Sequence, residues 1–303
     1  MTPRISVLIP IHNSERFVVE AVESMLAQTV RELEVVLVDD ASTDGSRALI
    51  AKLAARDPRI RVLHLSEKRG IAHALNRGME LCAGDWIARM DADDLSLPTR
   101  LEKQLAFADQ HPDAVLIGTD VTFIDEHSHV IGRNVRLPTE PAEIDRALMW
   151  GMWPIVHPSV IIRRATLLAL KGYCEELRVN SDHELFLRLA ETGRLYSIPE
   201  RLTRYRLHQQ QISAGREASP VEAIVRAASA RRGVKVLRPP LRVRLFGIGI
   251  SDVVDTQIYR DALAPIRELR AHLLRPGAWI GCGAAYVSYA FWSVARMFGR
   301  RRS

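Results

Sequence analysis

The sequence predicts an α/β protein in which helices cover both faces of a mostly parallel β-sheet, with a helical extension at the C-terminus. Segments typical of strands and of helices alternate four times within about the first hundred residues. The strand-like segments are nearly continuous apolar runs, as expected of parallel strands buried on both faces. The length of 303 residues suffices for one large α/β domain with an appendage, or for two domains.

In the first hundred residues, apolar runs are followed by apolar side chains at helical spacing. The expected strands are residues 5–9, 33–38, 60–65 and 85–90, and the expected helices are residues 17–26, 48–53 and 71–82. Pro10 is predicted to end the first strand, because proline cannot donate to a sheet ladder. The polar turn ASTDGS separates the second strand from the helix that follows it.

The rest of the chain mixes helices with shorter strands. Helices are expected from Pro98 to about residue 110, over 141–150 and over 182–191, strands over 114–119 and 155–164, and a hairpin over 121–132. From about residue 215 the pattern is helical and rich in arginine. We therefore divide the chain into a main domain, residues 1–215, and a basic helical region, residues 216–303.

The positive charge is concentrated near the C-terminus. The net charge is +6, yet residues 231–303 carry 14 Lys and Arg against 4 Asp and Glu, whereas residues 1–230 carry 28 against 32. Such a segment suits an anionic membrane surface, a nucleic acid or a solvated helical surface. Salt-sensitive binding to a nucleic acid would leave the acidic site described below unexplained, so no nucleic-acid partner is expected.

Residues 277–295 contain no charged side chain. Their length could span a membrane, but the segment is only mildly apolar and most of its large side chains share one helical face. A helix over 277–298 that lies in the membrane interface fits better. The alternative is a helix packed on the main domain or on a second subunit, which would make the chain a homo-oligomer.

The compartment is predicted from two features. Cys82, Cys174 and Cys282 lie far apart, which predicts neither a metal site nor a disulfide framework and favours a reducing cytosol. The N-terminal stretch MTPRISVLIPIHNSE has too short an apolar core for a signal peptide.

Acidic residues gather where the fourth strand ends. The stretch RMDADD places Asp91, Asp93 and Asp94 directly after the apolar run 86–88. In open parallel sheets ligands bind at the C-terminal strand ends, so these carboxylates should meet the residues that follow the first two strands. Clustered carboxylates are hard oxygen ligands and predict a site for Mg²⁺ or Mn²⁺. The alternative is a solvated turn in which an aspartate caps the next helix.

The other two strand ends carry polar residues as well. His12 and Asn13 follow the first strand, and Asp39 and Asp40 close the second. A buried strand that ends in two aspartates before a Ser/Thr/Gly turn could bind the ring nitrogens of a base and the hydroxyls of a ribose. The alternative is a tight turn at Asp44-Gly45 that is capped by the side chain of Asp44.

Four stretches together resemble a known family: ISVLIPIHN, SMLAQTV, EVVLVDDASTDGS and GDWIARMDADD. In order and spacing they are similar to the inverting nucleotide-sugar glycosyltransferases of the large second family, which have the Rossmann-like GT-A fold. The resemblance covers roughly residues 4–213. It implies that residues 1–215 form a catalytic domain.

The resemblance also implies a donor site at the strand ends. The residues implied to line the nucleotide pocket are Pro10, His12, Asn13 and Glu15. Asp40 would pair with the base, usually uracil, while Asp39 holds the turn. Asp91 and Asp93 fill the acid-any-acid motif, which contacts the ribose and the Mn²⁺ or Mg²⁺ bound to the diphosphate, and Asp94 replaces or assists one of them.

For the acceptor side, the resemblance places the general base at Asp182 in NSDHELFLRL. Transfer with inversion requires the attacking hydroxyl to lose its proton, which a carboxylate at a helix start can accept. His157, Arg206 and His208 match family positions near the diphosphate and the acceptor. The alternatives are that Asp182 is a helix N-cap and that His157 is a packed core histidine.

The chain departs from the family pattern at three positions. His12 stands where Tyr is usual, Ala41 where Gly is frequent, and Ser181 where many members carry an acid. We expect Ala41 to have a negative φ, and we expect Ser181 to change acceptor choice. The chain also lacks the Gln-x-x-Arg-Trp motif of processive synthases, which favours one sugar per encounter.

We therefore expect a metal-dependent inverting glycosyltransferase of hexosyltransferase type. Its donor would be a nucleotide-diphosphate sugar, by family habit a UDP-sugar, and its acceptor a glycan or lipid-linked intermediate of cell-surface polysaccharide. It would be cytoplasmic, with peripheral contact at the inner face of the cell membrane. One alternative is a nucleotidyltransferase, although PIHNSERF lacks the Gly-rich phosphate loop expected there; another is a nucleotide-sugar-binding module without activity.

Overall fold

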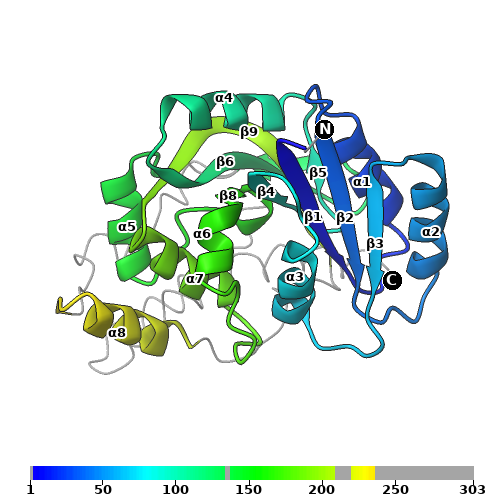
Figure 1. Cartoon of the computed structure of the whole chain (residues 1–303). Helices are drawn as coiled ribbons and strands as arrows, with labels where there is room; N and C mark the ends of the chain where they lie inside the picture. The colour runs from blue at the N-terminus through cyan, green and yellow to red at the C-terminus, as the bar shows by residue number, and fades with distance from the viewer. Residues whose placement is uncertain (1–2, 134–136, 209–219, 236–303) are drawn as a thin grey trace, which may run out of the picture.

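The computed structural model describes residues 3–133, 137–208 and 220–235. These residues form a nine-stranded sheet with helices on both faces (Figure 1). The strand order is β3-β2-β1-β4-β8-β6-β9-β5, and β7 pairs with β6. The strands are β1 Ile5–Ile11, β2 Leu33–Asp39, β3 Ile60–His64, β4 Trp86–Arg89, β5 Leu95–Ser96, β6 Ala114–Ile124, β7 Val130–Arg133, β8 Ile161–Arg163 and β9 Arg194–Arg206.

The predicted α/β fold with helices on both faces of the sheet is confirmed, and the part of the sheet formed by β1–β4 is parallel. β1 pairs in parallel with both β2 and β4, β3 pairs in parallel with β2, and β9 pairs in parallel with β6. β5, β7 and β8 run antiparallel to their neighbours, which makes the sheet mixed. Because β1, β2 and β4 are parallel neighbours, the residues that follow them emerge at one edge of the sheet.

The helices form two layers, one on each face of the sheet. They are α1 Val18–Leu26, α2 Ser46–Arg56, α3 Ile71–Met79, α4 Arg100–Gln110, α5 Pro141–Met149, α6 Arg164–Ala169, α7 Ser181–Ala190 and α8 Val221–Arg231. α1, α2 and α4 share an apolar core with Val35 and Leu37 of β2, whereas α3, α5, α7 and α8 share the opposite core with Val36 and Val38. Side chains of one strand thus enter two cores, which explains why β2 reads as a continuous apolar run.

The sequence predicted that Pro10 ends the first strand, and this prediction was wrong. β1 continues to Ile11, and Pro10 pairs with Val38 of β2. On the other side, the β1–β4 ladder ends at the pair Leu8 and Arg89. Proline lacks the N–H that would extend this ladder, so Pro10 ends the pairing with β4 and leaves the pairing with β2 intact.

Two other expectations in the second half were wrong in detail, and one strand was missed. Residues 155–164 are not one strand, because His157–Ser159 form a 3₁₀ turn before the short strand β8. The expected strand 114–119 and the first arm of the hairpin are a single strand, β6. β9, which was not predicted, pairs along β6 with several register shifts.

α8 belongs to the packed body of the described structure. Val221, Ile224, Val225 and Ala228 are buried in the same apolar core as α5 and α7. The rest of the basic region, including the expected helix 277–298, lies outside the described residues. Within the part that is described, no helix combines the length and the apolarity needed to cross a membrane.

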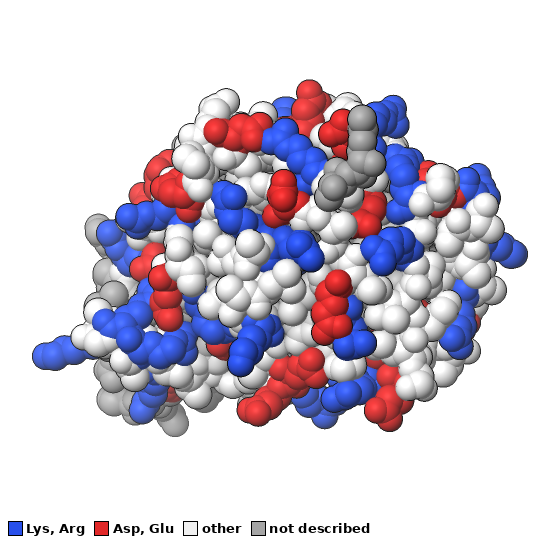
Figure 2. Space-filling view, viewed as in Figure 1, with Lys and Arg blue, Asp and Glu red and all other residues white. Residues whose placement is uncertain are grey.

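The described surface carries charges of both signs. On the face shown in Figure 2, Lys and Arg are interspersed with Asp and Glu and with uncharged side chains. A protein that binds nucleic acid through its backbone phosphates would gather basic side chains into a stripe or patch. This face has no such gathering among its described residues.

Candidate active site

The structure brings together the three strand ends that the sequence analysis singled out. Ile11 at the end of β1 pairs with Asp39 at the end of β2. His12 follows at once, and its Nδ1 lies 2.8 Å from the carbonyl oxygen of Asp40. β4 lies on the other side of β1, so the acidic residues after Arg89 reach the same edge.

Hydrogen bonds join the loop after β1 to the loop after β2. The N–H of Asn13 donates to Ser42 Oγ at 3.1 Å, and the N–H of Thr43 donates to Asn13 Oδ1 at 2.8 Å. The N–H of Gly45 donates to the Glu15 carboxylate at 2.6 Å. Asn13 and Glu15 therefore shape this wall of the site by fixing one loop against the other.

Asp39 and Asp40 have different surroundings. Asp39 is fully buried, accepts the N–H of Ser42 at 2.9 Å and lies 3.0 Å from His64 Nδ1. Burial opposes ionisation, but these hydrogen bonds outweigh it and hold the pKa of Asp39 below its ordinary value. The two oxygens of Asp40 accept the N–H groups of residues 69–70 at 2.9 and 2.8 Å. Each oxygen has a second lone pair, so Asp40 keeps acceptor capacity for a ligand.

Ala41 has a φ of +51°, so the expectation of a negative φ was wrong. β2 ends at Asp39, and the chain must turn back directly after Asp40, because the N–H of Ser42 donates to the Asp39 carboxylate. This tight Asx-type turn requires the left-handed region, which costs an alanine about 1–2 kcal/mol relative to its preferred conformations. Glycine, frequent at this place in the family, avoids that cost.

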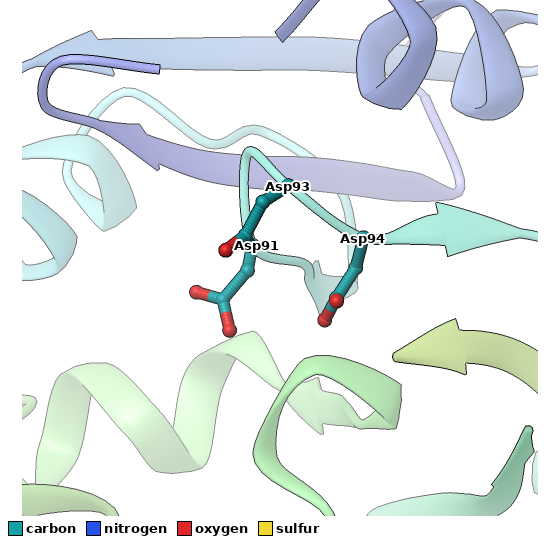
Figure 3. Close-up of side chains that lie close together, drawn as sticks. All are labelled: Asp91, Asp93 and Asp94. Carbon is teal, nitrogen blue, oxygen red and sulfur yellow. The ribbon is translucent and has the colours of Figure 1, made fainter. Parts of the chain in front are cut away.

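Three carboxylates lie together on the loop between β4 and β5. Asp91, Asp93 and Asp94 each offer one oxygen, and these oxygens lie within 4.8 Å of one another (Figure 3). Both oxygens of Asp91 are taken by the buried guanidinium of Arg89, at 2.7 and 2.5 Å. One oxygen of Asp93 lies 2.7 Å from Nε2 of His208. Part of the repulsion in this cluster is therefore relieved by side chains of the chain itself.

Asp94 is the most deeply buried of the three, with 1% of its surface exposed. Its Oδ1 accepts the N–H of Arg206 at 2.8 Å, while its buried Oδ2 has no partner among the described residues. Burial, together with the charges of Asp93 and Asp91, raises its pKa well above the ordinary value. A divalent cation would satisfy the unpaired oxygen and relieve the repulsion, so the cluster fits Mg²⁺ or Mn²⁺, with Asp93 and Asp94 as the available ligands.

Arg206 lies beneath the acidic loop and is only 1% exposed. Its guanidinium donates to the carbonyl of Asp93 at 2.7 Å, to the carbonyl of Asp125 at 3.1 Å and to Glu20 at 2.8 Å. These bonds tie the loop to α1 and to the end of β6. Direct contact with a diphosphate would require Arg206 to leave these partners, so its part in donor binding stays a prediction.

Asp182 lies in the first turn of α7. The N-cap position is Asn180, which has a φ of +61°, and no side chain caps the helix. Asp182 is the second residue of the helix, and its Oδ1 accepts the N–H of His183 at 2.8 Å. Burial raises the pKa of Asp91, and the charges of Asp93 and Asp182 raise it further, so Asp182 and Asp91 are within electrostatic reach of each other. The structure does not support the alternative that Asp182 serves as the N-cap.

Tyr173, which was not predicted from the sequence, joins the site to His157. The Tyr173 hydroxyl lies 2.9 Å from His157 Nε2, and the His157 ring also packs on Phe186. Burial lowers the pKa of His157 well below its ordinary value, which keeps the ring neutral. Burial also raises the pKa of Tyr173; the charge of Arg89 opposes this rise, and the charge of Asp182 adds to it. Nothing in the stretch KGYCEE signalled this role.

Comparisons with known proteins agree with this architecture. The model of the family described as glycosyl transferase family 2 matches residues 6–168. EpsE of Bacillus subtilis is 36% identical over 208 residues, which cover 67% of this chain and 73% of EpsE. AmsE of Erwinia amylovora, an amylovoran biosynthesis glycosyltransferase, is 31% identical over 214 residues, which cover 70% of this chain and 79% of AmsE.

Two solved structures share the fold at low sequence identity. S. aureus TarS in complex with UDP-GlcNAc superposes with a TM-score of 0.64 at 17% identity, over 96% of this chain and 79% of that chain. The mannosyltransferase PcManGT from Pyrobaculum calidifontis, in complex with GDP-Man and Mn²⁺, superposes with a TM-score of 0.59 at 17% identity, over 99% and 89%.

Proposed function

This chain belongs to glycosyl transferase family 2, and we propose that it moves one sugar, with inversion, from a nucleotide-diphosphate sugar to a hydroxyl of a glycan or lipid-linked acceptor. The chain is a glycosyltransferase with the GT-A fold. Family membership sets aside the nucleotidyltransferase alternative. The observation that supports the finer proposal is that Asp40 and the acidic cluster lie at one edge of the sheet, with Asp182 within electrostatic range of Asp91.

In the proposed donor site, the nucleotide lies across the ends of β1 and β2. Asp40 accepts a hydrogen bond from the base, for which its remaining lone pairs are suited. The loop of residues 12–15, fixed against residues 42–45, forms the wall of this pocket. We propose a UDP-sugar as the donor; among the solved relatives, TarS is bound to UDP-GlcNAc and PcManGT to GDP-Man, so GDP-sugars belong in the same test.

The acidic cluster is proposed to hold Mn²⁺ or Mg²⁺ together with the donor diphosphate. Asp93 and Asp94 supply the ligands, since Arg89 holds both oxygens of Asp91. When bound, such an ion neutralises the negative charge that develops on the leaving nucleotide diphosphate. His208 beside Asp93, and Arg206 below the loop, keep the ligand carboxylates in place. PcManGT was solved with Mn²⁺, which supports this choice of metal.

On the acceptor side, Asp182 is proposed to act as the general base. It takes the proton of the attacking hydroxyl while that oxygen forms its bond to the anomeric carbon from the face opposite the leaving group. The nearby His157 is kept neutral by burial and packs within the core, which suits a supporting role. Ser181, in place of a second acid, leaves Asp182 as the sole carboxylate among residues 180–183.

A panel of nucleotide sugars tests this proposal. The purified protein is screened for thermal stabilisation and for release of nucleotide with UDP-GlcNAc, other UDP-sugars and GDP-Man, each with Mn²⁺, Mg²⁺ or EDTA. We expect stabilisation and turnover with at least one donor, and loss of both in EDTA. Binding without turnover on any acceptor tested would indicate a binding module, and the absence of binding to every donor would refute the proposal.

We also propose peripheral contact with the inner face of the cell membrane through the basic C-terminal region. The support is compositional: residues 231–303 carry 14 Lys and Arg against 4 Asp and Glu, and residues 277–295 carry no charged side chain, which suits a helix in the membrane interface. Deleting residues 276–303 should release the protein from vesicles that contain anionic lipid and leave nucleotide release unchanged. Equal vesicle binding by the full chain and the deletion variant would contradict this. A homo-oligomer formed through the same region remains a prediction.

A further inference from the structure

α3 holds residues 170–175, the first part of the connection 170–180 between α6 and α7. The side-chain amide of Asn76 donates to the carbonyl of Tyr173 at 2.9 Å, and the N–H of Tyr173 donates back to Asn76 Oδ1 at 2.8 Å. The Asn76 amide also donates to Glu175 at 2.9 Å, and His73 Nδ1 lies 2.8 Å from the same carboxylate. A Cβ on Gly172 would lie 2.2 Å from Asn76 Oδ1, so the backbone here passes as close to α3 as it can.

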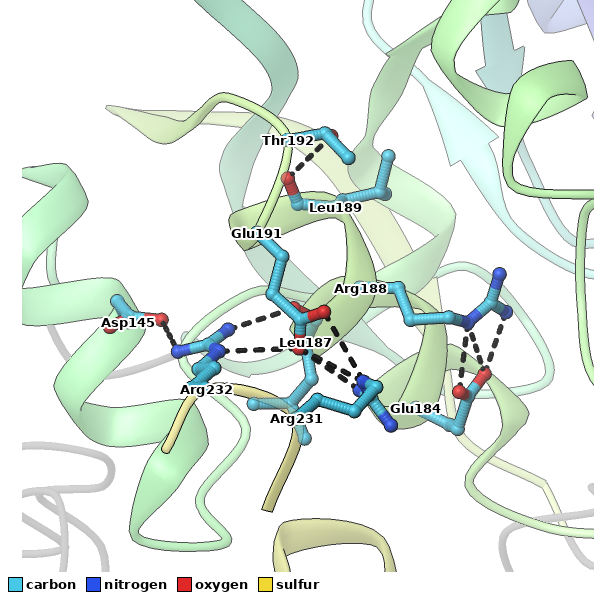
Figure 4. A network of polar contacts seen from close by, with 9 residues as sticks. All are labelled: Asp145, Glu184, Leu187, Arg188, Leu189, Glu191, Thr192, Arg231 and Arg232. Atoms are coloured by element: carbon cyan, nitrogen blue, oxygen red, sulfur yellow. Dashed lines mark hydrogen bonds and ion pairs between the residues drawn. The ribbon is translucent and has the colours of Figure 1, made fainter. Parts of the chain in front are cut away.

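α7 holds the same segment from its other side. The guanidinium of Arg188 donates to the carbonyl of Leu170 at 2.8 Å and to that of Gly172 at 2.7 Å. Glu184, one turn earlier on α7, accepts from the same guanidinium and fixes its orientation (Figure 4). α7 begins at Ser181 and carries Asp182 in its first turn. The segment 170–175 is therefore a spacer between α3 and the helix that carries the proposed base.

The other end of α3 is fixed to the donor side. The N–H groups of residues 69–70, directly before the helix, both donate to the Asp40 carboxylate. Near the end of α3, a Cβ on Gly78 would lie 2.3 Å from Leu8 and 2.7 Å from Val38, so the helix lies flush on β1 and β2. α3 thus runs directly from Asp40, where the nucleotide base is proposed to bind, to residues 170–175.

The far end of α7 is fixed as well. Arg232, just beyond α8, pairs with Asp145 at 2.6 Å and donates to the carbonyl of Leu187 at 2.8 Å (Figure 4). Arg231 pairs with Glu191 at 3.0 Å, directly after α7. With this end held by α8, a change in the spacer would move the start of α7 rather than its end.

We propose that Asn76 and Arg188 are positioning residues that set the distance between the donor at Asp40 and the base at Asp182. This inference rests on the function proposed above. Neither side chain needs to touch a substrate, because each acts through the spacer. Reacting atoms must approach to about 3–3.5 Å, and a misplacement of about 1 Å can cost about 100-fold in rate. The effect should therefore fall on kcat, while nucleotide affinity is kept.

Two variants and a matched control test the proposal. Asn76→Ala leaves the N–H and C=O of Tyr173 unpaired, and Arg188→Lys keeps the charge but loses the planar fork that reaches two carbonyls. Arg77→Gln is the control, since Arg77 follows Asn76 on α3 but faces solvent and pairs with Glu80. We expect kcat for nucleotide release from the best donor of the panel to fall about 10–100-fold in both variants. The Kd for UDP with Mn²⁺ should stay within about twofold of the wild type, and the control should match the wild type in both.

A double-mutant cycle separates positioning from general damage. If Asn76 acts through Asp182, then Asn76→Ala should add little to the loss already caused by Asp182→Asn. Multiplicative losses, unchanged kcat in Asn76→Ala, or a weakened Kd for UDP would each overturn the proposal. A failure of the proposed function looks different, because then Asp182→Asn itself would turn over normally.

Hydrogen exchange supplies a readout that needs no substrate. Amides of the first hydrogen-bonded turn of α7, residues 184–187, should exchange faster in Asn76→Ala than in the wild type or in Arg77→Gln. Amides of β1 and β2 should be unchanged. Equal protection of the α7 start in all three proteins would overturn the proposal even if activity could not be compared.

Discussion

Asp182→Asn is expected to lower kcat by about 10²–10⁴-fold, the usual contribution of a positioned general base. The substitution keeps the size of the side chain and can keep the contact with the N–H of His183, but the amide cannot accept a proton from the acceptor hydroxyl. Donor binding should persist, because the nucleotide is held at the opposite side of the site. Steady-state kinetics with the donor found in the panel and calorimetry with UDP and Mn²⁺ measure the two quantities.

Glu176→Gln is the matched control for this experiment. It removes one negative charge from the exposed part of the loop that leads to α7, at a residue with no assigned role. A fall in kcat shared by both variants would point to lost charge near the site rather than to a lost base. Normal transfer by Asp182→Asn would show that another group accepts the proton.

The parallel core could be predicted because its physical cause is local. Strands buried on both faces must be apolar throughout. In β2, Val35 and Leu37 enter one core, and Val36 and Val38 enter the other. The strand β9 escaped prediction because its run RLYSIPERLTRYR is largely polar and contains a proline. Its pairing with β6 shifts register near Asp120, so no period-2 pattern survives for a sequence analysis to find.

The candidate site could be predicted in part. Carboxylates at the end of a buried strand are costly unless a partner compensates them, so Asp91, Asp93 and Asp94 stood out. The partners themselves did not, because they come from distant positions. Arg206 lies 112 residues from Asp94 and Tyr173 lies 97 residues from Asn76, and no local pattern marks such pairs.

A second class of error concerned single residues inside a correct motif. At Ala41 the turn was predicted correctly, but the predicted sign of φ was wrong. The turn that brings the N–H of Ser42 to the Asp39 carboxylate requires a positive φ whatever the residue. For Pro10, the rule that proline ends a ladder was correct for one neighbour, β4, and did not apply to the other, β2. Both depend on which neighbours a residue has, which only the folded chain defines.

Asp93→Ala should abolish the metal-dependent part of stabilisation by the donor. In the wild type, a donor present at about 100 times its Kd adds about 2.7 kcal/mol to the free energy of unfolding. For a domain of this size, that is a rise in Tm of several degrees. With Asp93 gone, Asp94 alone offers a free oxygen, since Arg89 holds Asp91 on both of its oxygens. The Tm measured with UDP-sugar and Mn²⁺ should then equal the Tm measured with UDP-sugar and EDTA.

The control must remove a carboxylate without touching the cluster. Asp109→Asn does so, because Asp109 pairs with Arg4 just before β1, at the edge of the sheet opposite to the site. It should keep the full metal-dependent rise in Tm. In EDTA without donor, Asp93→Ala should unfold near the wild-type temperature, because the lost contact with His208 is offset by weaker repulsion within the cluster. If Asp93→Ala keeps the metal-dependent rise, Asp93 is not a required ligand and the assignment of the cation to Asp93 and Asp94 together is wrong.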